Sequence, residues 1–196
     1  MLRFVAVSVV TLTLAMSSAG RAATWELDPG HTSVQFSVRH LMVSNVRGEF
    51  GKVSGTVKVD DTDAAKSTIT ATIDVASLNT RNAKRDEHLR SPDFFDAAKY
   101  PTITFTSTKA EKTATGFKVT GDLTMHGVTK PVTLDVEGPT PEIKDPWGNA
   151  RAGAQATSKV DRRDFGITWN KALDAGGLTV GNEVSITIDV EAVKKP

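Results

Sequence analysis

The chain has 196 residues, with 24 Lys+Arg against 23 Asp+Glu and 39% hydrophobic residues. This is the composition of one globular domain, which argues against a disordered tail or a fibrous repeat. The charges are dispersed along the chain, so we expect no nucleic-acid partner, and the absence of cysteine excludes disulfides, thiolate nucleophiles and zinc–thiolate sites.

Residues 1–23 have the features of a cleaved signal peptide. Arg3 precedes an apolar run over residues 4–16, and small residues follow over residues 17–23. The run is shorter than the roughly 18 residues that a spanning helix needs, although a retained N-terminal anchor is the alternative. We therefore predict a leader over residues 1–23 and an exported domain over residues 24–196, located in the periplasm or, alternatively, secreted.

The next part of the chain alternates between apolar and polar residues. Val34, Phe36 and Val38 are separated by Ser and Gln, the period-two pattern of a strand with one dry face. The same pattern returns near residues 53–59, 69–75, 102–106, 117–123, 128–136, 150–160 and 184–190. This pattern predicts an all-β fold of about eight antiparallel strands. We favour a closed barrel over a sandwich, because closure removes exposed strand edges.

Two stretches interrupt the alternation. The apolar spacing at residues 42, 43 and 46 predicts a short helical turn over residues 41–46. Over residues 78–100 we predict a helical insertion, with Asn79 or Thr80 capping a first helix through Leu89 and Ser91 capping a second. Such an insertion could act as a lid or a plug for one end of the barrel.

A column of small residues predicts an internal cavity. Ala150, Ala152, Ala154, Ala156 and Ser158 share one parity, where the other strands carry larger apolar residues. If this column faces inward, it leaves an apolar space that a long ligand would fill. The alternative is that the alanines allow close packing under the insertion or at a tight seam.

Several motifs resemble the YceI-like family. They run in order from Trp25 to Val193 and comprise residues 25–28 (WELD), 31–41 (HTSVQFSVRHL), 48–50 (GEF), 85–89 (RDEHL), 91–96 (SPDFFD), 100–105 (YPTITF), 121–130 (GDLTMHGVTK) and 162–167 (RRDFGI). The resemblance implies an extended lipocalin-like antiparallel barrel in the bacterial periplasm that binds isoprenoid chains or similar long amphiphiles. It also implies that no catalytic residue and no metal is required.

The inward parity and the aromatic residues give a candidate ligand-binding set. Its members are apolar and lie on the predicted strands or next to them, and any one of them could instead be ordinary core: Val34, Phe36, Val38, Ile73, Ile103, Phe105, Phe117, Val119, Leu134, Ala152, Ala154, Ala156, Phe165, Trp169, Ile186 and Ile188.

Two arginines are candidates for binding a polar head group. Arg85 lies in the predicted insertion, and Arg162 precedes Phe165. A guanidinium presents forked donors that suit a phosphate or a quinone at the mouth of the barrel. The alternative is that Arg85–Asp86 and Arg162–Asp164 are local ion pairs that fix loops to the barrel.

Motifs for catalysis are missing. The four histidines have no metal-site spacing, and the chain contains neither a Gly-x-Ser-x-Gly elbow nor a phosphate loop. We therefore expect no catalytic residue, no metal and no cofactor other than a bound isoprenoid lipid or quinone.

These observations predict a carrier or store for an isoprenoid-type lipid. The alternatives are broad sequestration of hydrophobic compounds such as fatty amides or amphiphilic toxins under stress, a lipid-modifying enzyme, and a filled barrel with an interaction surface. We also expect transient contact with a membrane, and a homodimer is plausible for such a barrel.

Overall fold

The structure, a computed structural model, describes residues 23–60, 62–173 and 176–196. The predicted leader, apart from Ala23, lies outside these residues. One short helix, α1 (Ala83–Arg90), and three 3₁₀ helices, η1 (Ala64–Lys66), η2 (Val75–Ser77) and η3 (Arg162–Phe165), accompany the strands. The strands are β1 (Ala23–Leu27), β2 (Ser33–His40), β3 (Ser44–Phe50), β4 (Val53–Val59), β5 (Thr68–Asp74), β6 (Leu78–Asn79), β7 (Thr102–Lys112), β8 (Gly116–Met125), β9 (Val128–Glu137), β10 (Ile143–Lys144), β11 (Ala150–Asp161) and β12 (Val180–Lys194).

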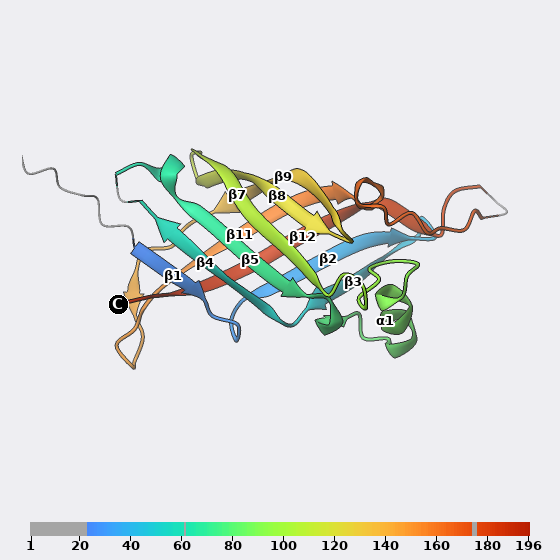
Figure 1. Ribbon diagram of the computed structural model, residues 1–196, viewed down its shortest axis with the longest axis horizontal. Helices are drawn as coiled ribbons and strands as arrows, with labels where there is room; N and C mark the ends of the chain where they lie inside the picture. Colours follow the sequence, from blue (N-terminus) through green and yellow to red (C-terminus); the bar gives the residue numbers. More distant parts are fainter. Residues whose placement is uncertain (1–22, 61, 174–175) are drawn as a thin grey trace, which may run out of the picture.

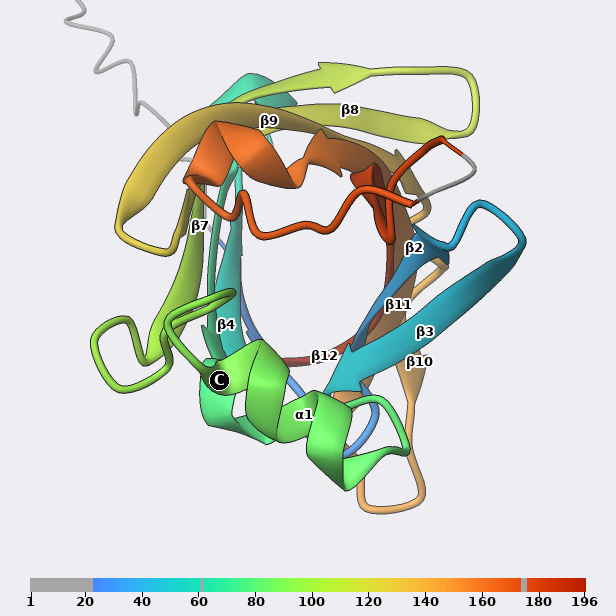
Figure 2. The ribbon, with the colours of Figure 1, turned by 90° about the vertical axis from the view of Figure 1, so that its right-hand side faces the viewer.

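Eight of these strands close into an antiparallel barrel. Around the ring, β11 pairs with β9, and the order continues through β8, β7, β5, β4 and β1 to β12. The ring closes because β12 also pairs with β11 along almost its whole length. Figure 1 shows the barrel from the side, and Figure 2 shows it along its axis. The predicted barrel is confirmed, and a two-sheet sandwich is excluded.

The other strands extend the sheet from this ring. The long strand β12 pairs with β2 through Val180–Asp189 and with β1 through Ala192–Lys194. From β2 the sheet continues to β3 and then to β6, while β10 pairs with β11. The β2–β3 hairpin therefore projects from the barrel at the end where α1 lies (Figure 1).

The period-two alternation produces the two faces of the barrel wall. Residues opposite one another in an antiparallel ladder point to the same side of a sheet. Val34 lies opposite Ile188, which lies opposite Ala156, which in turn lies opposite Val136. These apolar residues form a continuous band on the inside, and the intervening Ser, Gln and Thr residues point outward.

The predicted helical turn over residues 41–46 is wrong. Residues 41–43 form the turn of a hairpin, and Ser44 already begins β3. Seven pairs join β2 to β3, with Val46 opposite Val38. The apolar spacing that suggested a helix arises because the turn is itself apolar, and the cross-strand pairing overrides this local pattern.

The predicted insertion is present, but its boundaries differ. Leu78 pairs with Phe50 in β6, so the helix begins later than expected, and the side chain of Asn82 caps it by accepting a hydrogen bond from the backbone N–H of Arg85. The second predicted helix is absent, and residues 92–95 and 97–99 form turns. Asp96 has φ of 46°, a left-handed conformation that a right-handed helix cannot continue through.

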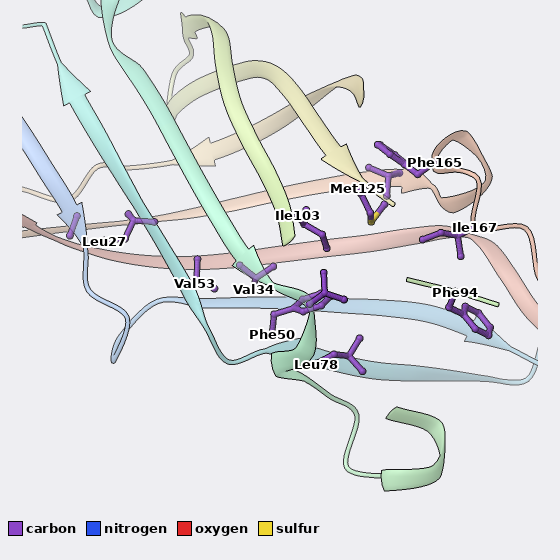
Figure 3. Close-up of a cluster of buried hydrophobic side chains, with 13 residues drawn as sticks. Leu27, Val34, Phe50, Val53, Leu78, Phe94, Ile103, Met125, Phe165 and Ile167 are labelled. Carbon is purple, nitrogen blue, oxygen red and sulfur yellow. The ribbon is translucent and has the colours of Figure 1, made fainter. Parts of the chain in front are cut away.

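An apolar cluster lies at the end of the barrel beside α1. Phe165 and Ile167 follow β11, and Phe94 comes from the insertion (Figure 3). Trp169 packs against Phe94, with ring centroids 5.2 Å apart. We call these four residues the end cluster. In the part of the chain that the structure describes, no helix combines the length and the apolar character needed to cross a membrane.

Candidate functional site: the barrel interior

The ladder registers place the strand residues of the predicted ligand-binding set on the inner face. Phe36 lies opposite Ile186, Ile73 opposite Ile103, and Val119 opposite Leu134. By the same cross-strand pairing, the remaining strand residues of the set lie on this face as well: Val34, Val38, Phe105, Phe117, Ala152, Ala154, Ala156 and Ile188. These residues therefore share one face of the barrel wall, and a ligand-binding role for them stays a prediction.

Much of this inner face is only half-buried. Val34, Ile103, Phe105, Val119 and Ala156 are buried, as expected for core residues. Others on the same face keep contact with solvent: Phe36, Val38, Ile73, Phe117, Leu134, Ala152, Ala154, Ile186 and Ile188. An inward-pointing side chain in the middle of a barrel reaches solvent only through space inside that barrel. Phe36, Ile73, Ile186 and Ile188 also pack against the buried core, so the inner face is partly covered and keeps apolar surface for a ligand.

The alanine column contributes to this space. Ala152 lies opposite Ala192, Ala154 opposite Val190, and Ala156 opposite Ile188. Because the neighbouring residues on β12 point inward, the alanines do so too, and each presents a methyl group where a Val, Ile or Leu would fill volume. Their position on the inner face agrees with the cavity interpretation. The close-packing alternative holds best at Ala156, which is buried.

The barrel wall has a hollow at the seam between β9 and β11. Only three residue pairs join these strands, the last being Thr157 with Asp135. Beyond that pair, the side chain of Ser158 donates a hydrogen bond to the carbonyl oxygen of Thr133 at 2.8 Å. A hollow of about 610 Å³ lies here, with both apolar and charged lining residues that include Val132, Val160, Phe165, Ile186, Lys130 and Asp164.

Lys130 is a residue that the sequence analysis missed. Its ladder partner is Leu123, so it has the parity of the inner face, yet it is exposed and lines the seam hollow. Val132 and Val160 line the same hollow. The sequence does contain a signal for Lys130. It is a charged residue at an inward position of β9, where Val128, Val132 and Leu134 are apolar.

Arg162 is buried, and its guanidinium is fully engaged by the protein. Nη1 donates to the carbonyl oxygens of Ile167 at 2.7 Å and Trp169 at 2.9 Å, and Nε donates to that of Gly181 at 2.9 Å. Burial lowers the pKa of Arg162 from its usual value. The side chain is 4% exposed and ties the segment after η3 to the start of β12. A role in binding a head group stays a prediction that this geometry does not favour.

Arg85 serves the local structure of the insertion. Nε donates to the hydroxyl of Thr80 and Nη2 to its carbonyl oxygen, both at 2.8 Å. Thr80 in turn donates from its backbone N–H and its hydroxyl to Asp86. Among the described residues, neither Arg85–Asp86 nor Arg162–Asp164 is an ion pair, so the loop-fixing role of the two arginines works through uncharged oxygens instead.

The two predicted ligand-binding residues outside the strands belong to the end cluster. Phe165 is 1% exposed, and Trp169 lies edge-on to His88 with ring centroids 5.0 Å apart. These rings pack against other protein side chains at the end of the barrel beside α1.

Asp28, His31 and Glu191 could together offer ligand atoms to a metal ion. However, Arg151 donates from Nη1 to Asp28 at 2.6 Å and to Glu191 at 2.5 Å. The guanidinium already supplies the positive charge at this cluster, and it holds the pKa of Asp28 at about 2. This arrangement does not favour a cation site.

Comparisons with known proteins agree with this architecture. A family model described as the YceI-like domain matches residues 25–192. The chain belongs to the YceI-like family. It is 41% identical over 194 residues to Protein YceI of Escherichia coli O17:K52:H18, covering 96% of this chain and 98% of that protein.

Solved structures place the same fold in other members of the family. A Campylobacter jejuni YceI protein is 32% identical, with a TM-score of 0.66 over 97% of this chain and 100% of that one. A polyisoprenoid binding domain from Saccharophagus degradans, implicated in plant cell wall breakdown, superposes with a TM-score of 0.63. At 16% identity over 87% of this chain and 98% of that one, the latter supports the fold alone.

Proposed function

We propose that this chain binds a long isoprenoid-type lipid, such as a polyprenyl chain or a quinone, in the barrel interior. The observation that carries the proposal is the apolar inner face, on which Phe36, Leu134 and Ile188 remain half-buried rather than buried. Apolar surface that remains hydrated is stabilised by transfer to an apolar ligand. A domain with the same fold is named a polyisoprenoid binding domain, and the proposal extends that class of ligand to this chain.

The energetics favour recognition of the tail by burial alone. Each buried methylene-sized group contributes about 0.8 kcal/mol, so about ten of them supply roughly 8 kcal/mol, which corresponds to micromolar affinity before any binding cost. A polyprenyl tail has several times as many carbons, and ordering such a tail offsets much of the gain. The length of the chain is therefore weakly specified, and any sharp specificity must come from the head group.

We further propose that the domain works as a carrier or store in the periplasm. The features of residues 1–23 support export. A long apolar lipid is poorly soluble in the aqueous periplasm, so a protein that binds it there would shield it from water. The absence of a catalytic motif from the sequence supports binding without chemical conversion of the lipid. The mass of the mature protein from a periplasmic fraction would identify the cleavage site.

Native mass spectrometry of the exported full chain, followed by organic extraction, tests the proposal. A single long-chain species at near-stoichiometric occupancy is expected. A mixture of unrelated hydrophobic compounds would instead establish broad sequestration. An empty protein that also takes up no long-chain probe would overturn the proposal, and chemical conversion of an added lipid would show that it is an enzyme.

A matched pair of variants localises the site. Ala154 and Gln155 are neighbours on β11 with opposite parity, Ala154 half-buried and inward, Gln155 exposed and outward. Ala154→Phe fills interior volume and should lower lipid occupancy, whereas Gln155→Phe adds the same ring outside and should not. Equal occupancy in both variants would place the ligand elsewhere.

A further inference from the structure

The β2–β3 hairpin ends in an exposed apolar tip. Leu41, Met42 and Val43 are consecutive, with exposed fractions of 38%, 54% and 75%. We call these three residues the hairpin tip. It lies at the end of the barrel that carries α1, and it projects beyond the barrel wall (Figures 1 and 2). Isolated exposed apolar residues are common on proteins, but three in succession at a projecting turn form a patch that water solvates poorly.

The backbone conformation at the hairpin tip is unfavourable for Leu41 and Met42. The N–H of Val43 donates to the carbonyl oxygen of His40 at 3.1 Å, and Leu41 and Met42 have φ of 50° and 60°. Positive φ at both central residues is the type I′ turn, for which Asn-Gly is the favoured pair. Leu and Met are strained in this conformation. Their side chains therefore lower stability both through the backbone and through hydration.

The hairpin tip is held in place by its surroundings. The N–H of Leu41 donates to the carbonyl oxygen of Thr179 at 2.8 Å, which joins the tip to the segment before β12. Arg39 donates from Nη2 to the carbonyl oxygen of Met42 at 3.0 Å. The apolar side chains are thus presented on a braced turn, so little ordering is needed when they meet a partner.

Positive charge flanks the apolar side chains. Arg39 and Arg47 are exposed on the two strands of the hairpin, and His40 adjoins the turn. From Thr32 to Gly48 the sequence contains no Asp or Glu. The bonds of Arg39 run to a carbonyl oxygen and to the side chain of Asn45, both uncharged, and neither Arg39 nor Arg47 forms an ion pair with the residues that the structure describes. An apolar tip beside exposed cations is the chemistry that binds an anionic lipid interface.

We propose that the hairpin tip docks this protein on an anionic lipid bilayer, with Leu41, Met42 and Val43 inserted among the head groups and Arg39 and Arg47 against the lipid phosphates. Docking of this kind is separate from lipid binding in the interior, because the tip lies outside the barrel. It holds the barrel at a surface where long-chain lipids are taken up or released.

The double variant Leu41→Asn/Met42→Gly tests the proposal without damaging the fold. Asn-Gly suits the type I′ turn, so the melting temperature should be unchanged or raised. Co-sedimentation with phosphatidylcholine vesicles containing phosphatidylglycerol should fall by about tenfold relative to the unmodified protein. Vesicles of phosphatidylcholine alone should retain little of either protein. Lipid occupancy of the interior should be the same in the double variant as in the unmodified protein, as measured by extraction. This measurement distinguishes a loss of docking from a loss of lipid binding in the interior.

Trp147→Asn is the matched control. Trp147 is 80% exposed in the turn between β10 and β11, and it is not part of the hairpin. Its loss should leave vesicle binding unchanged. If the Trp147 variant loses vesicle binding and the double variant keeps it, the proposal is overturned. If the unmodified protein is a dimer that the double variant converts to a monomer without any change in vesicle binding, the hairpin tip is a self-association surface and the proposal is equally overturned.

Discussion

Nη1 of Arg162 donates a hydrogen bond to the carbonyl oxygen of Trp169 at 2.9 Å, so a buried cation holds the segment that follows η3 at one end of the barrel. The same guanidinium bonds the carbonyl oxygens of Ile167 and Gly181. The planar, rigid guanidinium donates to all of these carbonyl oxygens at once. The ammonium group of a lysine, on a flexible side chain, does not reproduce this geometry. The end cluster therefore depends on a polar tie as well as on apolar packing.

Replacing Arg162 should destabilise the protein strongly. In Arg162→Met the carbonyl oxygens of Ile167 and Trp169 lose their donor, and each unsatisfied buried group costs about 1–3 kcal/mol. We expect the free energy of unfolding in urea to fall by about 3 kcal/mol or more, with Arg162→Lys restoring only part of it. Arg163→Met is the control, because the Arg163 side chain is exposed and its ion pair with Asp161 should contribute less than about 1 kcal/mol. Equal effects of the two Met variants would contradict the structural role of Arg162.

The ion-pair cluster around Arg151 should make stability depend on acid pH. Hydrogen bonds from Arg151 lower the pKa of Asp28 from 3.8 to about 2, and they lower that of Asp145 further. A carboxyl group whose folded-state pKa is depressed stabilises the protein above its unfolded pKa and loses that contribution as pH falls through the folded pKa. The stability difference between the unmodified protein and Arg151→Met should therefore be full near neutral pH and shrink from about pH 4 to about pH 2.

Urea unfolding across that pH range measures this difference. Lys194→Met provides the comparison, because its ion pair with Glu142 is exposed on both sides and should leave the acid profile nearly unchanged. A difference between the unmodified protein and Arg151→Met that stays constant down to about pH 2 would show that the carboxyl groups are not coupled to Arg151 in the folded state.

Gly121 is needed for close packing of β8 against β7. A Cβ at this position would lie 2.4 Å from Cζ of Phe105 and 2.6 Å from the carbonyl oxygen of Thr106. Gly121→Ala should therefore lower the free energy of unfolding by about 1–3 kcal/mol, because a buried ring and the backbone must both move. In Gly51→Ala the added carbon meets nothing closer than 3.9 Å, so this variant should be nearly neutral. Chemical denaturation of the two variants compares them directly.

Two phenylalanines distinguish the packed end from the open interior. Phe165 is 1% exposed in the end cluster, so Phe165→Ala should cost about 3–5 kcal/mol of unfolding free energy. Phe117 is half-buried on the inner face, so Phe117→Ala should cost less than about 3 kcal/mol in the lipid-free protein. Saturation with a long-chain lipid should increase the cost at Phe117 and leave that at Phe165 unchanged. Equal costs in the lipid-free protein would indicate a filled interior.

The alternation of apolar and polar residues determined the strands and their buried face. Val34, Phe36 and Val38 could be assigned to one face from period two alone, because successive strand residues point to opposite sides. The parity of Ala152, Ala154 and Ala156 likewise followed from the sequence, since one residue of slip would have turned the whole column outward. These are local properties of the chain.

The tertiary structure alone decided the features that depend on partners distant in sequence. The turn at Leu41 and Met42 is determined by the pairing of β2 with β3, although Leu and Met disfavour the positive φ that this turn requires. From the sequence, Arg162 was a candidate for binding a head group. The structure shows that its guanidinium is bonded to protein groups up to twenty residues away along the chain. The half-buried state of Leu134 and Ile188 depends on how far the barrel walls stand apart, which strand number and stagger determine and no short stretch of sequence encodes.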